Sequence, residues 1–185
     1  MTEEPVVGGP HLVREVHPEM GQALGSLWLD VVRCGGAVSF RTDAPEEDIR
    51  AAAEAEISDV RAERQQLLVI GADHTLVGTV FLRPGVGSVF QHRAEVHRLM
   101  VRSDLQGRGW GGMLLDAVVA HATILGLEQL MLAVRGGTWM IEFYRSRGWA
   151  EVGVWPGALA VTPDDVRDQH WFQLRLGAAR PLPLS

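Results

Sequence analysis

Hydrophobic residues recur with strand spacing in several short runs of the chain. The pattern predicts two strands, Gln66 to Ala72 and Thr75 to Leu82, which Asp73-His74 joins as a hairpin and Pro84-Gly85 ends. Further strands are predicted over residues 11–16, 94–101, 129–134, 150–154 and 170–176. These runs indicate a sheet of short strands.

Other segments carry helical periodicity. Helices are predicted over residues 18–35, 45–64, 113–125 and 138–148. Gly126 is a suitable C-terminal stop for the third helix, and Thr138 is a suitable N-cap for the fourth. Two helices therefore precede the hairpin, and strands and helices then alternate, which predicts a mixed α/β domain.

Length and composition place the chain among ordinary globular proteins. Its 185 residues are 46% hydrophobic and 22% charged, which is enough for one well-packed core. We expect a single domain over residues 11–176, with flexible ends at 1–10 and 177–185, where glycine and proline are frequent.

Charge and composition exclude several classes of function. A net charge of −6 argues against nucleic-acid binding, and no apolar run reaches the roughly 20 residues of a membrane span. The N-terminus lacks a signal-peptide pattern and Cys34 is the single cysteine, so a cytoplasmic protein is expected. The chain has no lysine, which excludes a Walker A loop and Schiff-base chemistry.

The most informative run is Gln106-Gly107-Arg108-Gly109-Trp110-Gly111, which lies between a predicted strand and a predicted helix. Glycines let a ligand approach the backbone closely, because no Cβ is in the way. The unpaired N–H groups of a first helical turn attract anions. This run therefore predicts a phosphate-binding loop.

Two other interpretations fit the same glycines. Gly107-x-Gly109-x-x-Gly112 matches the dinucleotide fingerprint, but Glu128 precedes its strand rather than ending it. Too little chain follows to build a doubly wound sheet. A purely structural turn is the second alternative, although it leaves Arg108 unexplained.

At this point the residues resemble a known family. Gln106-x-x-Gly109-x-Gly111 after a strand is similar to the acetyl-CoA loop of the GNAT superfamily of N-acetyltransferases. The segment Glu142 to Trp149 resembles a second motif of that superfamily, and the order of elements matches over residues 11–176. The resemblance implies a mostly antiparallel sheet of six to seven strands, flanked by about four helices.

The closest branch resembles the tabtoxin-resistance acetyltransferases. The stretches His92 to Val96 and Val152 to Gly157 point there, together with Trp171-Phe172. Ala133 and Ala158 depart from that branch, which has an acidic residue and a tyrosine at these positions. The substrate of that branch is therefore not carried over.

The resemblance also implies how acetyl-CoA, the co-substrate, would be held. The pantetheine arm would pair with the backbone of Leu99, Met100 and Val101. The amides of Gln106 through Gly111 would hold the pyrophosphate, with Gly107 and Trp110 within the loop and Arg108 adding charge. Thr138 would contact the coenzyme, with a plain N-cap as the alternative. No metal is expected, since the seven histidines form no compact ligand cluster in the sequence.

Three residues are candidates for proton transfer. Tyr144, the only tyrosine, matches the family residue that donates to the coenzyme sulfur, although it also fits a core aromatic. Glu95 and His97 are candidate bases and share one strand face with Leu99 and Val101. The alternatives are a water relay, an ion pair of Glu95 with Arg93 or Arg98, and a hydrogen-bonded histidine.

The expected reaction is direct acetyl transfer to the primary amine of a small molecule, such as an amino acid, an antibiotic or a biosynthetic intermediate. A non-catalytic acyl-CoA-binding domain is the alternative. Neither nucleic acid nor membrane is expected as a partner. Many proteins of this superfamily dimerise, so a homodimer is one expectation.

Overall fold

The computed structural model describes residues 8–36, 38–72, 75–162 and 164–177. The elements follow in the order β1 (His11–Leu12), α1 (Met20–Arg33), α2 (Glu46–Arg61), β2 (Gln66–Ala72), β3 (Thr75–Pro84), β4 (Arg93–Val101), a 3-10 turn (Ser103–Leu105), α3 (Trp110–Ile124), β5 (Gln129–Arg135), α4 (Met140–Arg145), β6 (Ala150–Thr162) and β7 (Asp165–Arg175).

Within these described ranges, seven strands form one sheet in the order β1-β2-β3-β4-β5-β7-β6. All neighbours are antiparallel except β4 and β5, which are parallel. The fold predicted from the resemblance, a mostly antiparallel sheet flanked by four helices, is confirmed.

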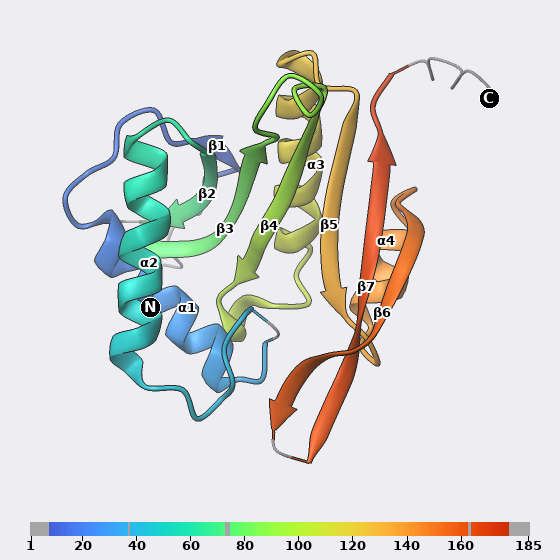
Figure 1. Cartoon of the computed structure of the whole chain (residues 1–185). Helices are drawn as coiled ribbons and strands as arrows, with labels where there is room; N and C mark the ends of the chain where they lie inside the picture. The colour runs from blue at the N-terminus through green and yellow to red at the C-terminus, as the bar shows by residue number, and fades with distance from the viewer. Residues whose placement is uncertain (1–7, 37, 73–74, 163, 178–185) are drawn as a thin grey trace.

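Helices cover both faces of the sheet (Figure 1). On one face, α1 and α2 pack over β2, β3 and β4, and the largest side chain buried there is Trp28. On the opposite face lie α3 and α4, where Leu114, Tyr144 and Phe172 belong to a second core cluster. Successive side chains of β2 point to opposite faces and so belong to both clusters. Leu67 and Val69 lie in the first cluster, and Leu68 and Ile70 lie in the second.

Several element boundaries differ from prediction. The first strand is only His11–Leu12, and α4 ends at Arg145 rather than at Gly148. The prediction of Thr138 as N-cap is wrong, since Trp139 occupies that position and the Thr138 hydroxyl donates to the carbonyl of Arg135 at 2.9 Å. The predicted Asp73-His74 turn and the outer parts of both termini lie outside the described residues.

The largest difference is the long hairpin of β6 and β7. The sequence predicted that the first of these strands ends at Val154. In the structure β6 continues to Thr162 and projects beyond the other strands with β7 (Figure 1). Strand β6 tolerates Pro156 because it lies at the edge of the sheet and has a hydrogen-bonded neighbour on one side only. Its pairing with β7 is also irregular, with three shifts of register.

Substitution of Gly78 tests how tightly α3 packs on the sheet. A Cβ added to Gly78 in β3 would lie 2.9 Å from both Leu114 Cδ1 and the carbonyl oxygen of Met100. We expect Gly78→Ala to lower the free energy of unfolding by about 1–3 kcal/mol, as overpacking does. Gly153→Ala in β6, where no atom lies within 4 Å, should change it by less than about 0.5 kcal/mol. Urea unfolding of the two variants measures both values, and equal losses would contradict the packing described.

Candidate active site

The central feature of the site is a separation between two parallel strands. Strands β4 and β5 pair only at Arg93 with Gln129, Ala94 with Leu130 and Glu95 with Met131. Beyond Glu95 the two strands diverge toward their carboxyl ends (Figure 1), although β3 still pairs with β4 and β7 with β5. Between their facing edges the sheet therefore contains a wedge in which no strand-to-strand ladder forms.

An irregularity in β4 accompanies this separation. Thr79 pairs with Met100 and Phe81 with His97, so β4 has one residue more than β3 across this interval. Arg98 lies in the interval with a φ of 50°, in the left-handed region. The extra residue is therefore a β-bulge.

The bulge corrects one sequence prediction. Glu95, His97, Leu99 and Val101 were expected on one face by strict alternation. His97 instead packs on Phe81 toward α1 and α2, at 5.3 Å between ring centroids, whereas Leu99 and Val101 belong to the cluster under α3. The bulge inverts the alternation, and the side chains divide between the two faces.

Arg98 ties the bulge to its surroundings. Its guanidinium lies 4.5 Å above the ring of Trp28 and pairs with Glu56 at 3.2 Å. Nη1 donates to the hydroxyl of Ser39, in the loop between α1 and α2, at 2.7 Å. Burial is the main cause that lowers the pKa of Arg98. Within the described ranges, its buried Nε is the side-chain atom left without a hydrogen-bond partner.

The environment of His97 makes it a weak base. Gln65 Oε1 lies 3.0 Å from its Nε2 and also accepts from Arg83, so the ring nitrogen is the donor. Burial, followed by the charges of Arg83 and Arg98, lowers the pKa of His97 to about 3. The imidazole is therefore neutral at physiological pH, with little affinity for a proton.

Glu95 is placed differently. It is the last residue of β4 that pairs with β5, and its side chain is 43% exposed. The alternative considered for Glu95, an ion pair with Arg93 or Arg98, does not form, because Arg93 lies over Phe90 and Arg98 pairs with Glu56. Its nearest cation is Arg83 Nη1, at 4.0 Å. The carboxylate thus lies accessible where the two strands separate.

The glycine loop leads into α3, and the amides of the first helical turn are free. Gly107 and Gly109 have φ values of 76° and 88°, and in each case an added Cβ would meet no atom within 4 Å. The first bond of the helix runs from the amide of Met113 to the carbonyl of Gly109. The amides of Trp110, Gly111 and Gly112 therefore form the open end of the helix.

The side chains of this loop leave those amides uncovered. Gln106 Nε2 donates to the carbonyl of Val101 at 2.9 Å, which ties the loop to the end of β4. Arg108 is exposed, and the first turn of α3 carries no acidic residue and no side-chain cap. The loop therefore has the geometry and charge that bind a phosphate.

Tyr144 is buried on the opposite face from Glu95. Its ring packs against three aromatic rings, those of Phe143, Trp149 and Phe172, with centroids between 5.2 and 5.9 Å away. Burial raises its pKa well above the ordinary phenol value. Among the residues that the structure describes, no hydrogen-bond partner of its hydroxyl is found, and the raised pKa keeps the phenol protonated and able to donate a hydrogen bond.

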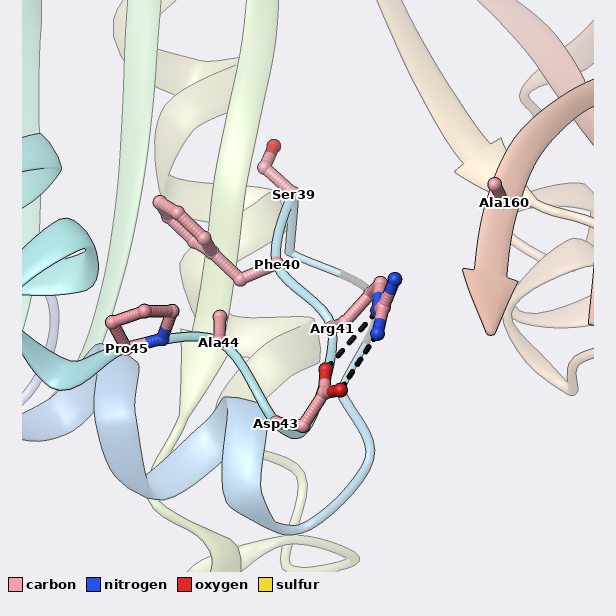
Figure 2. Close-up of a pocket in the computed structure, with 7 residues that line it drawn as sticks. All are labelled: Ser39, Phe40, Arg41, Asp43, Ala44, Pro45 and Ala160. Atoms are coloured by element: carbon pink, nitrogen blue, oxygen red, sulfur yellow. Dashed lines mark hydrogen bonds and ion pairs between the residues drawn. The ribbon is translucent and has the colours of Figure 1, made fainter. Parts of the chain in front are cut away.

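A shallow depression lies near the carboxyl ends of β4 and β5, where the two strands have separated. Figure 2 shows the α1–α2 loop on one side of it and Ala160 of β6 on the other. Its lining residues are Ser39, Phe40, Arg41, Asp43, Ala44, Pro45 and Ala160. Arg41 and Asp43 neutralise each other at 2.6 Å, and Arg135 of β5 holds the same loop through the carbonyl of Gly35.

A family model, the acetyltransferase (GNAT) family, matches residues 37–149 of the chain. The chain belongs to the GNAT family of acetyltransferases. The match includes the diverging strands, the glycine loop and Tyr144. Proteins of this family use acetyl-CoA.

Solved structures agree with this GNAT fold. An N-acetyltransferase from Staphylococcus aureus is 14% identical, with a TM-score of 0.72 over 91% of this chain and 99% of its own. A ribosomal-protein-alanine N-acetyltransferase from Brucella melitensis is 20% identical, with a TM-score of 0.70 over 92% and 99%. A protein from Salmonella typhimurium, solved with its cofactor acetyl-CoA, is 17% identical, with a TM-score of 0.70 over 94% and 98%.

The structure brings some predicted site residues of this GNAT acetyltransferase together. Gln106 through Gly111 form one loop against the end of β4, while Glu95 and Tyr144 lie on opposite faces of the sheet. Sequence reasoning named Arg98 only as an alternative partner of Glu95 and missed its place in the bulge, because nothing in the sequence marks the bulge. In the described part of the chain, no cluster of three metal-ligating side chains occurs, and no helix is long and apolar enough to cross a membrane.

The buried His97 should make stability depend on pH. The pKa of His97 is about 3 in the folded protein and about 6.5 in the unfolded chain. As the pH falls below 6.5, the unfolded chain therefore binds a proton at His97 that the folded protein does not bind, and the free energy of unfolding decreases. This contribution is complete above pH 6.5 and is lost toward pH 3, by up to about 1.4 kcal/mol per pH unit. His97→Gln keeps a donor for Gln65 and should lose less stability between pH 7 and pH 5. Urea unfolding at both pH values tests this, and identical losses would contradict it.

Proposed function

We propose that the protein transfers the acetyl group of acetyl-CoA directly to the primary amine of a small molecule. The observation that carries the proposal is the wedge between β4 and β5, which ends at the free amides of the glycine loop. The unpaired strand edges suit an extended chain containing amides, and the loop suits a diphosphate. Coenzyme A contains both groups.

The residues around the wedge fit this coenzyme. The backbone of Leu99, Met100 and Val101 would hold the pantetheine arm, and the amides of residues 106–111 would hold the pyrophosphate. Glycines at 107 and 109 leave the approach to these amides clear, since no atom occupies the Cβ positions. Arg108 adds a positive charge, and Thr138 lies just before α4. When bound, acetyl-CoA supplies an acetyl group activated as a thioester.

In this proposal, Tyr144 donates a hydrogen bond to the departing sulfur. Burial raises the pKa of the phenol, so the hydroxyl stays protonated at every physiological pH. A raised pKa also favours hydrogen bonding to a thiolate over full transfer of the proton. Tyr144 therefore stabilises the leaving group chiefly as a donor.

Glu95 is the better candidate for the base. Its exposed carboxylate can reach water and an incoming amine, whereas His97 donates to Gln65 and has a pKa of about 3. A primary amine with a pKa near 10 is mostly protonated at pH 7, so it must lose a proton before attack. Glu95 would accept that proton directly or through water.

The acceptor would enter from the side of α1 and α2. The depression beside Ser39 and Ala160 lies there, and no helix of the described residues covers the same face of β5, β7 and β6 (Figure 1). Ala133 of β5 pairs with Trp171 of β7, and its small side chain leaves room for the acceptor. We propose that the protein is related to the tabtoxin-resistance branch. That branch has an acidic residue where this chain has Ala133, so we propose that the acceptor is different.

Two further expectations belong to this proposal. The net charge of −6 favours a small molecule over nucleic acid or a membrane surface as the partner, and cell fractionation should locate the protein in the cytoplasm. We also propose a homodimer, which sedimentation analysis would test; a monomer at micromolar concentration would contradict it.

An assay of turnover distinguishes the proposed enzyme from the alternative, a non-catalytic acyl-CoA-binding domain. With a panel of primary amines and acetyl-CoA, the protein should release free coenzyme thiol in proportion to acetylated amine, which a thiol reagent and mass spectrometry measure together. Binding of acetyl-CoA without thiol release for any amine would support the non-catalytic alternative. Absence of both binding and release would contradict the proposal as a whole.

A variant of the glycine loop tests whether the loop binds the coenzyme. An added side chain at Gly111 would meet only Val101 Cγ2, at 3.8 Å, so Gly111→Val should fold normally. It should nevertheless lose coenzyme binding, because the valine covers the amides of the first helical turn.

Removal of the tyrosine hydroxyl tests the proton donor. Tyr144→Phe keeps the ring contacts with Phe143, Trp149 and Phe172 and should preserve the fold. We expect kcat to decrease by about 10²-fold, the usual size of one acid–base contribution, with little change in KM for acetyl-CoA. Steady-state kinetics measure both constants, and an unchanged kcat would remove Tyr144 from the mechanism.

A further inference from the structure

Arg147, which follows α4, lies against the first turn of α3. A Cβ added to Gly112 would be 2.3 Å from Arg147 Nη2, 3.2 Å from Cζ and 3.5 Å from Nε. The guanidinium therefore occupies the space that a side chain at position 112 would need. Gly112 is the third residue of the helix whose open end forms the glycine loop.

A second contact holds the guanidinium in this position. Its Cζ lies 4.2 Å from the centre of the Phe143 ring, within the range of a cation–π interaction. The side chain thus lies between an aromatic ring of α4 and the backbone of α3. This arrangement orients the guanidinium without using its five N–H donors.

The charge of Arg147 has no protein partner in the described residues. Its neighbour Arg145 is different, because it pairs with Glu142 at 2.6 Å and with Glu151. No carboxylate lies within ion-pair distance of Arg147 or of Arg108 in the described part of the chain. Both arginines nevertheless lie close to the amino end of α3.

This position is electrostatically unfavourable without a ligand. The amino end of a helix carries a partial positive charge, so a nearby cation is repelled while an anion is stabilised. The first turn of α3 contains no acidic residue that would compensate. An incoming polyanion would relieve the repulsion and would use the free donors of Arg147.

We propose that Arg147 recognises a phosphate group at the nucleotide end of the coenzyme, in addition to the loop of residues 106–111. The inference rests on the proposed function, which supplies the ligand. Coenzyme A offers two phosphate sources, the diphosphate and the 3′-phosphate of the ribose. Arg147 thereby favours acyl donors that carry the nucleotide over donors that end at pantetheine.

Binding measurements on matched variants test the proposal. Calorimetry with coenzyme A compares the unaltered protein with Arg147→Gln, Arg147→Lys and the neighbouring control Arg145→Gln. We expect Arg147→Gln to weaken binding about tenfold, the usual loss of one charge-assisted contact. Arg147→Lys should recover part of this loss, and Arg145→Gln should bind like the unaltered protein.

Two analogues identify the phosphate and exclude a merely structural effect. Dephospho-coenzyme A lacks only the 3′-phosphate, so an equal affinity of Arg147→Gln for both coenzymes would assign the contact to that group. A tenfold loss with both would assign it to the diphosphate. With S-acetylpantetheine, which has no phosphate, kcat/KM should be the same for Arg147→Gln and the unaltered protein.

Three results would overturn the inference while leaving the proposed function intact. These are unaltered coenzyme affinity in Arg147→Gln, an equal loss in Arg145→Gln, and a parallel loss of kcat/KM with S-acetylpantetheine. Failure of the unaltered protein to bind coenzyme A would instead contradict the proposed function itself.

Discussion

After Glu95, strands β4 and β5 no longer exchange hydrogen bonds, so their facing backbone groups need other partners. A buried backbone amide or carbonyl without a partner costs free energy comparable to a lost hydrogen bond. Such an edge is therefore tolerated only where water or a ligand can satisfy it. The bulge at Arg98 accompanies the separation, and Arg98 itself is anchored by Glu56, Trp28 and Ser39. The rest of the site depends on this interruption of the ladder.

The sheet separates two chemical environments. On the side of α3 and α4, the free amides and Arg108 provide positive charge, and Tyr144 remains protonated in an apolar surrounding. On the side of α1 and α2, Glu95 remains exposed to water. A thioester lying in the wedge would meet a proton donor from one side and an amine from the other. In the proposed mechanism, the groups that would donate and accept protons therefore lie apart and do not neutralise each other.

Local sequence signals predicted much of this arrangement. The β2–β3 hairpin, the glycine loop and α3 follow from neighbouring residues, since turns and helix starts are decided by contacts close in sequence. The bulge could not be predicted, because it depends on the register between β4 and β3, which are distant in sequence. The same holds for His97. Its surroundings come from Gln65, Arg83 and Glu56, and only the folded chain brings them together.

The irregular course of β6 has a consequence for the whole molecule. An ordinary outer strand offers a row of vacant donors and acceptors to any further strand, including one from another molecule. In β6, Pro156 contributes no donor, and three register shifts disturb the spacing of the others. Indefinite stacking of protomers edge to edge is thereby discouraged. Self-association that preserves the wedge would have to use helices or sheet surfaces instead of prolonging the ladder.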